Sequence, residues 1–257
     1  MSVPSVVVHR DADVLANAVA ARIITRLVDV QSARGSASIV LTGGTVGIAT
    51  LAAIAATPAR DAVDWHRLDI WWGDERFLPS GDKERNETGA REVLLDHVDV
   101  NPERVHVMLG PDSGLTAEES AESYAAELRR AARPEDHAPV PGFDVMLLGM
   151  GPDAHVASLF PGMPALYDTR AVVAVHGAPK PPPTRISLTL PAIQSSREVW
   201  VVAAGEEKSG AVRLALSESG HVQVPASGAR GRARTLFLLD RAAASKIPPE
   251  LGRISSP

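Results

Sequence analysis

Short runs of β-branched and other apolar residues alternate along this chain with longer segments in which apolar residues recur every three or four positions. The runs that read as strands are SVVVHR, SASIVL, RLDIWW, RVHVML, FDVMLLG, AVVAVHG, RISLTL, EVWVVAA and TLFLLD. Many are apolar on both faces, which is typical of strands in a parallel sheet that helices cover on both sides. The pattern therefore predicts an α/β fold with a doubly wound, mostly parallel sheet and helices on both of its faces.

Residues that start and stop helices stand between these runs. Asp11 or Asp13 precedes a long segment with an apolar residue at every fourth position, and Gly35 follows that segment. Thr116 and Glu119 have the spacing of a capping box at a helix start. Further helices are expected in VGIATLAAIAA, NETGAREVLLDHV and EEKSGAVRLAL, with a short one in HVASLF.

Composition limits the class of protein. With 257 residues, 45% of them hydrophobic, we expect a single domain spanning 1–257. The net charge of −5 disfavours a nucleic-acid partner, which requires clustered Lys and Arg, and the lack of cysteine excludes disulfides and a thiolate nucleophile. Because no secretory leader and no run of about 18 apolar residues is seen, we expect a cytoplasmic monomer or weak homo-oligomer without a membrane partner.

Paired glycines follow the second run, in LTGGTVG. In open, Rossmann-like sheets, ligands bind beyond the carboxyl ends of the strands, and a glycine turn leading into a helix lets backbone amides reach an anion. Gly43, Gly44 and Thr45 are therefore candidates for binding a phosphate, and the alternative is an ordinary tight turn. Thr42 stands where a dinucleotide motif has its first glycine, and no Gly-Lys pair occurs, so a nucleotide site is disfavoured.

A charged triplet, DER, follows the third run. Arg76 could clamp a phosphate through two parallel hydrogen bonds, with Asp74 beside it in the same site. The alternative is a solvated cluster in which Asp74 and Arg76 pair with each other. Arg85 and Asn86, at the start of the next predicted helix, are expected to brace this loop.

The stretch GMGPDAHVASLFPG places titratable side chains directly after an apolar strand. Asp153 could orient the ring of His155 or hold its protonated form, and the flanking glycines would let a ligand approach, so we predict that His155 is a general base. The alternative is that His155 is an ordinary surface or core histidine. The other histidines show no metal-binding spacing, so no metal site is expected.

Four segments together resemble the 6-phosphogluconolactonase family: GMGPDAHVASLFPG, LTGGT, WGDER followed by ERN, and PKPPPTRISLTLPAI. The resemblance extends over essentially the whole chain. It implies the fold that this family shares with glucosamine-6-phosphate deaminases, no metal or organic cofactor, and hydrolysis of a sugar-phosphate substrate, the δ-lactone of 6-phosphogluconate, in the pentose phosphate pathway. It also implies that His155 is the base and that Gly43, Gly44, Thr45 and Arg76 contact the phosphate.

A mechanism follows from this substrate as a hypothesis. A lactone is an activated ester, so a positioned water molecule and a base suffice to open it. We expect Asp153 to support His155, while Lys180 and Arg185, which flank a proline-rich loop, make a second contact with the phosphate or carbonyl. The alternative for Lys180 and Arg185 is that they are exposed charges on a stiff loop. Backbone amides of Gly149–Gly151 are candidate donors to the oxyanion.

Two features depart from the family pattern. Ala154 stands where glycine is common between the aspartate and the histidine, and because alanine at positive φ costs about 1 kcal/mol, we expect an ordinary backbone there. The second departure is GGTVG, where many family members read closer to GGSTP.

Three other functions are weighed against the lactonase. A deaminase or isomerase of amino-sugar phosphates typically has a segment resembling IAFNEPG after the histidine, and here it is VASLFPG. A non-catalytic sugar-phosphate sensor would be expected to carry a partner domain, and none is apparent. A serine hydrolase of the α/β type requires G-x-S-x-G, which does not occur.

Overall fold

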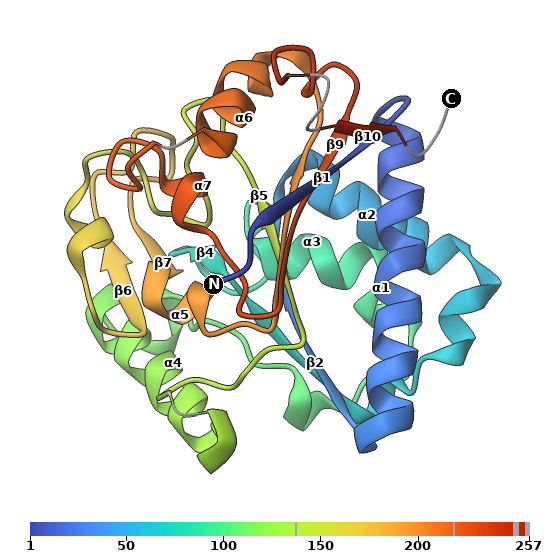
Figure 1. The fold of residues 1–257 in the computed structure, drawn as a ribbon. Helices are drawn as coiled ribbons and strands as arrows, with labels where there is room; N and C mark the ends of the chain where they lie inside the picture. The colour runs from blue at the N-terminus through green and yellow to red at the C-terminus, as the bar shows by residue number, and fades with distance from the viewer. Residues whose placement is uncertain (137, 218, 249–251, 255–257) are drawn as a thin grey trace.

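A parallel sheet forms the centre of the protein (Figure 1). The computed structural model describes residues 1–136, 138–217, 219–248 and 252–254. The strands of the main sheet are β1 (Pro4–His9), β2 (Ala37–Leu41), β3 (Leu68–Trp72), β5 (Val145–Gly149), β8 (Glu198–Ala203), β9 (Arg234–Asp240) and β10 (Gly252–Ile254). Their order across the sheet is β10-β1-β9-β8-β5-β2-β3, and all neighbouring strands are parallel.

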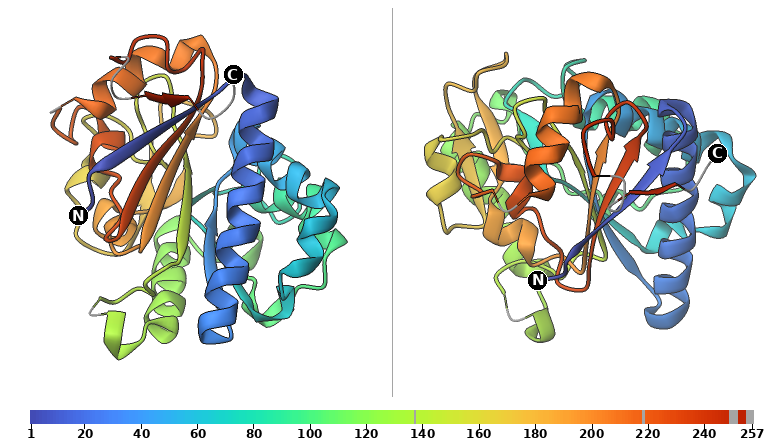
Figure 2. Two further views of the ribbon diagram at one scale, coloured as in Figure 1. Left: turned by 45° about the vertical axis from the view of Figure 1, so that its right-hand side comes forward. Right: turned by 45° about the horizontal axis from the view of Figure 1, so that its top comes forward.

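Helices cover both faces of this sheet, as Figure 2 shows from two further sides. One face carries α1 (Ala12–Arg34), α2 (Gly44–Ala56) and α3 (Asn86–Val93), and the other carries α4 (Ala117–Ala131), α5 (Leu190–Gln194), α6 (Ser209–Leu216) and α7 (Pro225–Gly228). Alternate residues of a strand enter different cores: Ile39 and Leu41 pack with the first group of helices, and Val40 packs with the second. This arrangement confirms the predicted doubly wound α/β fold.

The predicted helix ends are confirmed where they depend on local contacts. Asp11 is the N-cap of α1, and its side chain accepts a hydrogen bond from the N–H of Val14 at 2.8 Å. The helix ends at Gly35, which has a φ of 79°. Thr116 and Glu119 form the predicted capping box at the start of α4. Each of these interactions joins residues only a few positions apart, which is why the sequence pattern reveals them.

Two of the predicted strands lie outside the main sheet. A separate antiparallel sheet consists of β4 (Asp74–Arg76), β7 (Arg185–Leu188) and β6 (Val172–Val175), with β7 in the middle. Residues 176–184 alone join β6 to β7, whereas a parallel crossover takes about a dozen residues or more. The expectation that these two runs join the parallel sheet is therefore wrong: they pair with each other as an antiparallel hairpin, since the connection is too short for a parallel crossover, and the hairpin adds β4 instead of the main sheet.

The run RVHVML, at residues 104–109, is not the predicted strand. It makes one isolated bridge to β3, between Val105 and Ile70. Farther along the run, the carbonyl oxygen of Met108 accepts a hydrogen bond from the side chain of Arg85 at 2.7 Å, so a side chain takes the place of a strand partner. At the other edge of the sheet, β10 pairs with β1, although the sequence pattern predicts no strand there.

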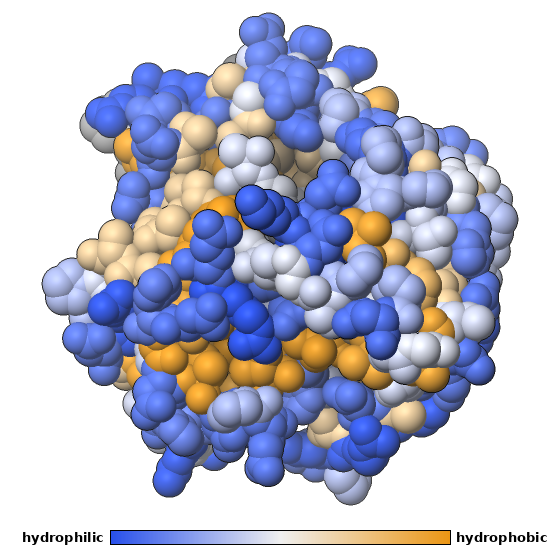
Figure 3. All heavy atoms as spheres, turned by 180° about the vertical axis from the view of Figure 1, so that it is seen from behind, coloured by the Kyte–Doolittle hydropathy of each residue, from blue (hydrophilic) through white to orange (hydrophobic). Residues whose placement is uncertain are grey.

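Most large apolar side chains pack against the sheet. Seen from behind, the surface is largely hydrophilic, with an apolar band across its lower half (Figure 3).

Among the described residues, no helix combines the length and the apolar character needed to cross a bilayer.

The strand order reverses between β2 and β5. The chain adds β3 on one side of β2, and then adds β5, β8 and β9 in turn on the other side. Connections that diverge at such a switch point leave a crevice beyond the carboxyl ends of the strands. The glycine turn after β2 and the loop containing His155 after β5 both start at this crevice, and β4 follows β3 beside it.

Candidate active site

A pocket of about 270 Å³ opens at this switch point. Its wall includes most of the predicted site residues, namely Gly43, Gly44, Asp74, Arg76, His155, Lys180 and Arg185. Asp153 adjoins the pocket through its contact with His155. Thr45 lines a neighbouring hollow of about 450 Å³, which shares Gly43 and Gly44 with the pocket. The fold therefore gathers side chains that the sequence scatters over more than half of its length.

Asp153 holds the imidazole of His155 from one side. The Nδ1 atom of His155 lies 2.5 Å from Oδ1 of Asp153, and the histidine side chain is 16% exposed. Both side chains lie over Gly151, where an added Cβ atom would come within 2.0 Å of His155 Nδ1. Only glycine at this position permits the pairing. Since Nδ1 is engaged by the carboxylate, Nε2 is the ring nitrogen left for a ligand.

The protonation states of this pair suit base catalysis. Burial lowers the pKa of His155 below its ordinary value of 6.5, and this outweighs the opposite effect of the Asp153 carboxylate. Burial alone would raise the pKa of Asp153, but the hydrogen bond and charge of His155 outweigh it and hold that pKa low. At neutral pH the imidazole is therefore neutral and directs its Nδ1 proton at an ionised carboxylate, as a general base requires.

The segment HVASLF, at residues 155–160, is not the predicted helix. It consists of turns and isolated bridges, and Ala157 has a φ of 49°. Just before the segment, Ala154 has a φ of 66°. Alanine residues with positive φ do not fit the interior of a right-handed helix. The side chain of His155 is thus carried by an irregular loop.

The expectation of an ordinary backbone at Ala154 is also wrong. Its methyl group is 2% exposed and packs in the core beneath the site. Burying one such group contributes about 0.8 kcal/mol, which offsets most of the strain of about 1 kcal/mol at positive φ. The loop also holds Ala154 in place, since its N–H donates to the carbonyl of Gly151 and its carbonyl accepts from the N–H of Ala226, both at 3.0 Å. Alanine is therefore tolerated where glycine is common.

The glycine turn presents the start of a helix to the pocket. Gly43 is the N-cap of α2, which begins at Gly44, so the free N–H groups and the positive end of the helix dipole lie at the pocket wall.

The hydroxyl oxygen of Thr42 accepts a hydrogen bond from the N–H of Gly149 at 3.2 Å. The N–H of Gly151 donates to the carbonyl of His155 at 3.0 Å. Both of these glycine amides are used within the protein, which argues against the prediction that they stabilise the oxyanion.

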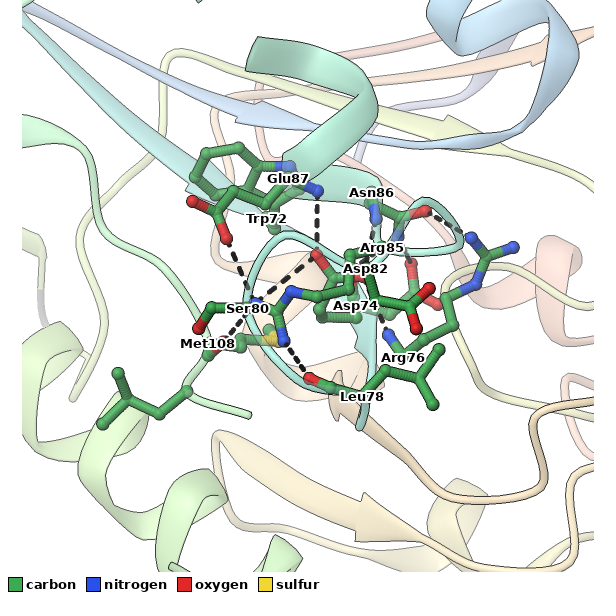
Figure 4. A network of polar contacts seen from close by, with 12 residues as sticks. Trp72, Asp74, Arg76, Leu78, Ser80, Asp82, Arg85, Asn86, Glu87 and Met108 are labelled. Carbon is green, nitrogen blue, oxygen red and sulfur yellow. Dashed lines mark hydrogen bonds and ion pairs between the residues drawn. The ribbon is translucent and has the colours of Figure 1, made fainter. Parts of the chain in front are cut away.

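Asp74 and Arg76 do not form the solvated pair that was the alternative for this triplet (Figure 4). Asp74 is 7% exposed, and its carboxylate accepts a hydrogen bond from the hydroxyl of Ser158 at 2.6 Å. Arg76 donates from Nη1 to Oδ1 of Asn86 at 3.0 Å and to the carbonyl oxygen of Glu84. Its Nε is buried and has no hydrogen-bond partner within the described part of the chain. Its Nη2 makes no hydrogen bond to the described residues either, so Nη2 is the donor that the guanidinium keeps for a ligand in the pocket.

Arg85 and Asn86 brace the loop, as predicted. The guanidinium of Arg85 donates to the carbonyl oxygens of Leu78 at 2.9 Å and Met108 at 2.7 Å. Asn86 donates from Nδ2 to the carbonyl oxygen of Asp74 at 2.9 Å. These bonds tie the loop after β4 to the start of α3.

Arg185 shapes the proline-rich loop. It is 5% exposed, and its guanidinium donates to the carbonyl oxygens of Lys180, Pro181 and Pro182. The alternative of an exposed charge on a stiff loop is therefore wrong for Arg185. Lys180 is an exposed residue, and it lines the pocket.

Lys208 is a pocket residue that the motifs do not reveal. It lies after β8, just before α6, and lines both the pocket and the neighbouring hollow. Burial and the charge of Lys180 lower its pKa. Its position beyond the carboxyl end of a parallel strand is the signal that could have found it.

In the ranges that the structure describes, no group of three or more His, Asp or Glu side chains is arranged to hold a metal ion.

Comparison with known proteins identifies the family of this chain. The family model for glucosamine-6-phosphate isomerases/6-phosphogluconolactonase matches residues 10–238. The chain belongs to this family. Among its relatives, 6-phosphogluconolactonase from Streptomyces coelicolor is 61% identical over 251 residues, which cover 96% of each chain. The 6-phosphogluconolactonase of Mycobacterium tuberculosis is 47% identical over 247 residues, which cover 95% of this chain and 98% of the relative.

Solved structures of the 6-phosphogluconolactonase family have the same fold. That of 6-phosphogluconolactonase from Trypanosoma brucei is 30% identical and superposes with a TM-score of 0.83, covering 95% of this chain and 99% of the other. A monomeric glucosamine-6-phosphate deaminase, 20% identical with a TM-score of 0.77, shares the fold alone. The resemblance inferred from the four sequence segments is therefore confirmed at the level of the family.

Proposed function

We propose that the protein hydrolyses the δ-lactone of 6-phosphogluconate, a reaction of the pentose phosphate pathway. The observation that carries the proposal is the pairing of His155 with Asp153 in a pocket whose other walls hold Arg76 and the start of α2. Such a pocket supplies a base and an anion site together. The name of the Streptomyces coelicolor relative, 61% identical, supports this choice of substrate.

In the proposed reaction, Nε2 of His155 removes a proton from a water molecule as the water oxygen attacks the lactone carbonyl carbon. The ionised carboxylate of Asp153 stabilises the imidazolium that forms. When the tetrahedral intermediate collapses, the bond between the carbonyl carbon and the ring oxygen breaks, and the imidazolium returns its proton to that oxygen. That transfer restores the neutral histidine, and the new carboxylic acid then ionises and releases one proton.

The phosphate would be held by other groups that line the pocket. Arg76 offers a guanidinium with unused donors, Gly43 and Gly44 lie at the start of α2, and Lys180 and Lys208 add positive charge. Holding the phosphate at one end of the sugar fixes the carbonyl carbon at the other end relative to His155. Such positioning replaces a collision in solution with a reaction inside one complex.

The activity is tested by proton release at low buffer strength. Freshly prepared 6-phosphogluconolactone mixed with the purified protein is expected to acidify the solution faster than spontaneous hydrolysis does, with one proton released for each lactone opened. Glucosamine 6-phosphate is assayed in parallel for release of ammonia. Ammonia release without lactone opening would assign the protein to the deaminase branch, and no acceleration of either reaction would refute the proposal.

The pH dependence follows from the groups around His155. Because burial lowers the pKa of this residue below 6.5, kcat/KM is expected to be constant near neutral pH and to fall only at lower pH, as the base becomes protonated. Asp153 raises this pKa and Lys180 lowers it. The acidic limb should therefore move to lower pH in Asp153→Asn and to higher pH in Lys180→Gln. Shifts in the same direction in both variants would contradict the assignment of His155 as the base.

A further inference from the structure

Glu75 joins β4 to the start of α3 through buried hydrogen bonds. Its side chain is 2% exposed. Oε1 accepts from the backbone N–H groups of Arg76 at 2.8 Å and Asn86 at 2.7 Å, and Oε2 accepts from the N–H of Glu87 at 2.8 Å. A carboxylate from the strand thus takes the place of a capping side chain at the first turn of the helix. The backbone of Asn86 is thereby fixed relative to β4.

The side chain of Asn86 then contacts two of the charged residues of the pocket, Asp74 and Arg76 (Figure 4). Oδ1 accepts from Nη1 of Arg76 at 3.0 Å, while Nδ2 donates to the carbonyl oxygen of Asp74 at 2.9 Å and to its carboxylate at 3.4 Å. Arginine can only donate and a carbonyl oxygen can only accept, so the amide has a single orientation that satisfies both neighbours. Asn86 is 5% exposed and has little freedom to adopt another.

The same amide also packs against the glycine turn. A Cβ atom at Gly43 would lie 1.9 Å from Oδ1 of Asn86. Gly43 has a φ of −86°, which any residue can adopt, so space rather than backbone conformation requires glycine here. Asn86 is therefore in contact with the turn at the start of α2 and with Arg76 on β4.

We propose that Asn86 is a positioning residue that sets the guanidinium of Arg76 against the glycine turn at Gly43, so that the two bind one phosphate group of the substrate together. This inference rests on the proposed function. A long arginine side chain loses conformational entropy when a ligand immobilises it. Holding Arg76 in its binding geometry before the substrate arrives removes part of that loss and strengthens binding.

The test compares two substrates that differ only in the phosphate. Wild type, Asn86→Ala, Arg76→Ala and the double variant are assayed with 6-phosphogluconolactone and with glucono-δ-lactone, which lacks the phosphate. Asn86→Ala is expected to raise KM for the phosphorylated lactone about tenfold, with a smaller change in kcat, and to leave kcat/KM for glucono-δ-lactone nearly unchanged. The double variant should be no worse than Arg76→Ala alone, because Asn86 acts through Arg76.

Two results would overturn the inference. Equal losses for both substrates would mean that Asn86 is merely structural, and losses that multiply in the double variant would mean that it acts independently of Arg76. Thr88→Ala, in the same turn of α3, is the matched control and should behave as wild type. If Asn86→Ala does not fold, Asn86→Leu provides the same test, since leucine fills a similar volume but has no oxygen to accept from Arg76.

Calorimetric binding of inorganic phosphate to the same proteins separates this inference from the proposed function. If the wild type opens neither lactone but phosphate affinity falls in Asn86→Ala and is no lower in the double variant than in Arg76→Ala alone, the proposed function fails and the positioning role stands. If the wild type is active and phosphate affinity is the same in all four proteins, the positioning role fails alone.

Discussion

Replacing His155 with alanine is expected to lower kcat by about 10²- to 10⁴-fold, the range in which a positioned general base contributes. The affinity for the product 6-phosphogluconate should change little, because the phosphate is held by Arg76 and the start of α2 on other walls of the pocket. The two quantities are measured by steady-state lactone hydrolysis, with the spontaneous rate subtracted, and by calorimetric titration of the product.

The control for this variant is His66→Ala. His66 is an exposed histidine that lies 3.3 Å from Asp99, and it is not among the residues of the pocket. It should keep the kcat of the wild type, which shows that loss of a histidine in itself has no effect. If His155→Ala retained full turnover, another group would have to be the base, and the role assigned to Asp153 would fail with it.

The second large effect is expected on stability, from Arg85→Met. The guanidinium of Arg85 is 1% exposed, lies 3.2 Å from the carboxylate of Glu87 and 4.0 Å from that of Glu75, and donates to the carbonyl oxygens of Leu78 and Met108. Methionine fills a similar volume but removes the donor to both carbonyl oxygens and the positive charge beside both carboxylates. Breaking a buried ion pair in this way costs about 3–5 kcal/mol, measured as the free energy of unfolding in urea.

Arg91→Met is the matched control, since Arg91 also pairs with Glu87, at 2.8 Å, but its side chain is 39% exposed. An exposed pair one helical turn apart contributes only about 0.3–0.5 kcal/mol. Equal destabilisation by the two variants would show that burial does not determine the cost of losing the ion pairs of Arg85.

A pH series tests the electrostatic part of the Arg85 prediction. Burial raises the pKa of Glu75 to about 7, against the charge of Arg85 and the hydrogen bonds from backbone N–H groups, which lower it. Because this folded-state value lies above the ordinary 4.5, the contribution of protonated Glu75 to stability is fully present below the ordinary value and is lost as pH rises through about 7. Without Arg85 the loss should be larger, so Arg85→Met is expected to be more destabilised near pH 8 than near pH 6. Equal destabilisation at the two pH values would contradict the link between Arg85 and Glu75.

Sequence patterns predict those parts of the structure that depend on neighbouring residues. The strands of the main sheet other than β10, the N-cap at Asp11, the end of α1 at Gly35 and the pairing of Asp153 with His155 all involve residues within a few positions of one another. The site could also be located, because the carboxyl ends of parallel strands are where ligands bind in such sheets.

The errors have a common cause in contacts between distant parts of the chain. RVHVML is not a strand, and Arg85 holds one of its carbonyl groups. Ala154 adopts a positive φ because its methyl group is buried and Ala226 holds its carbonyl. Lys208 was missed because it reaches the pocket from a strand end that carries no recognisable motif.

The sequence by itself determined the class of fold, the family, and the histidine and carboxylate that are candidates for catalysis, because periodicity, capping and short motifs are properties of local segments. Only the tertiary structure decided which side chains share the pocket, how Asn86 links Arg76 to Gly43, and that β4, β6 and β7 form a sheet of their own. Those contacts depend on the order in which strands pair and on the space left between packed elements. Neither is encoded within any one segment of the chain.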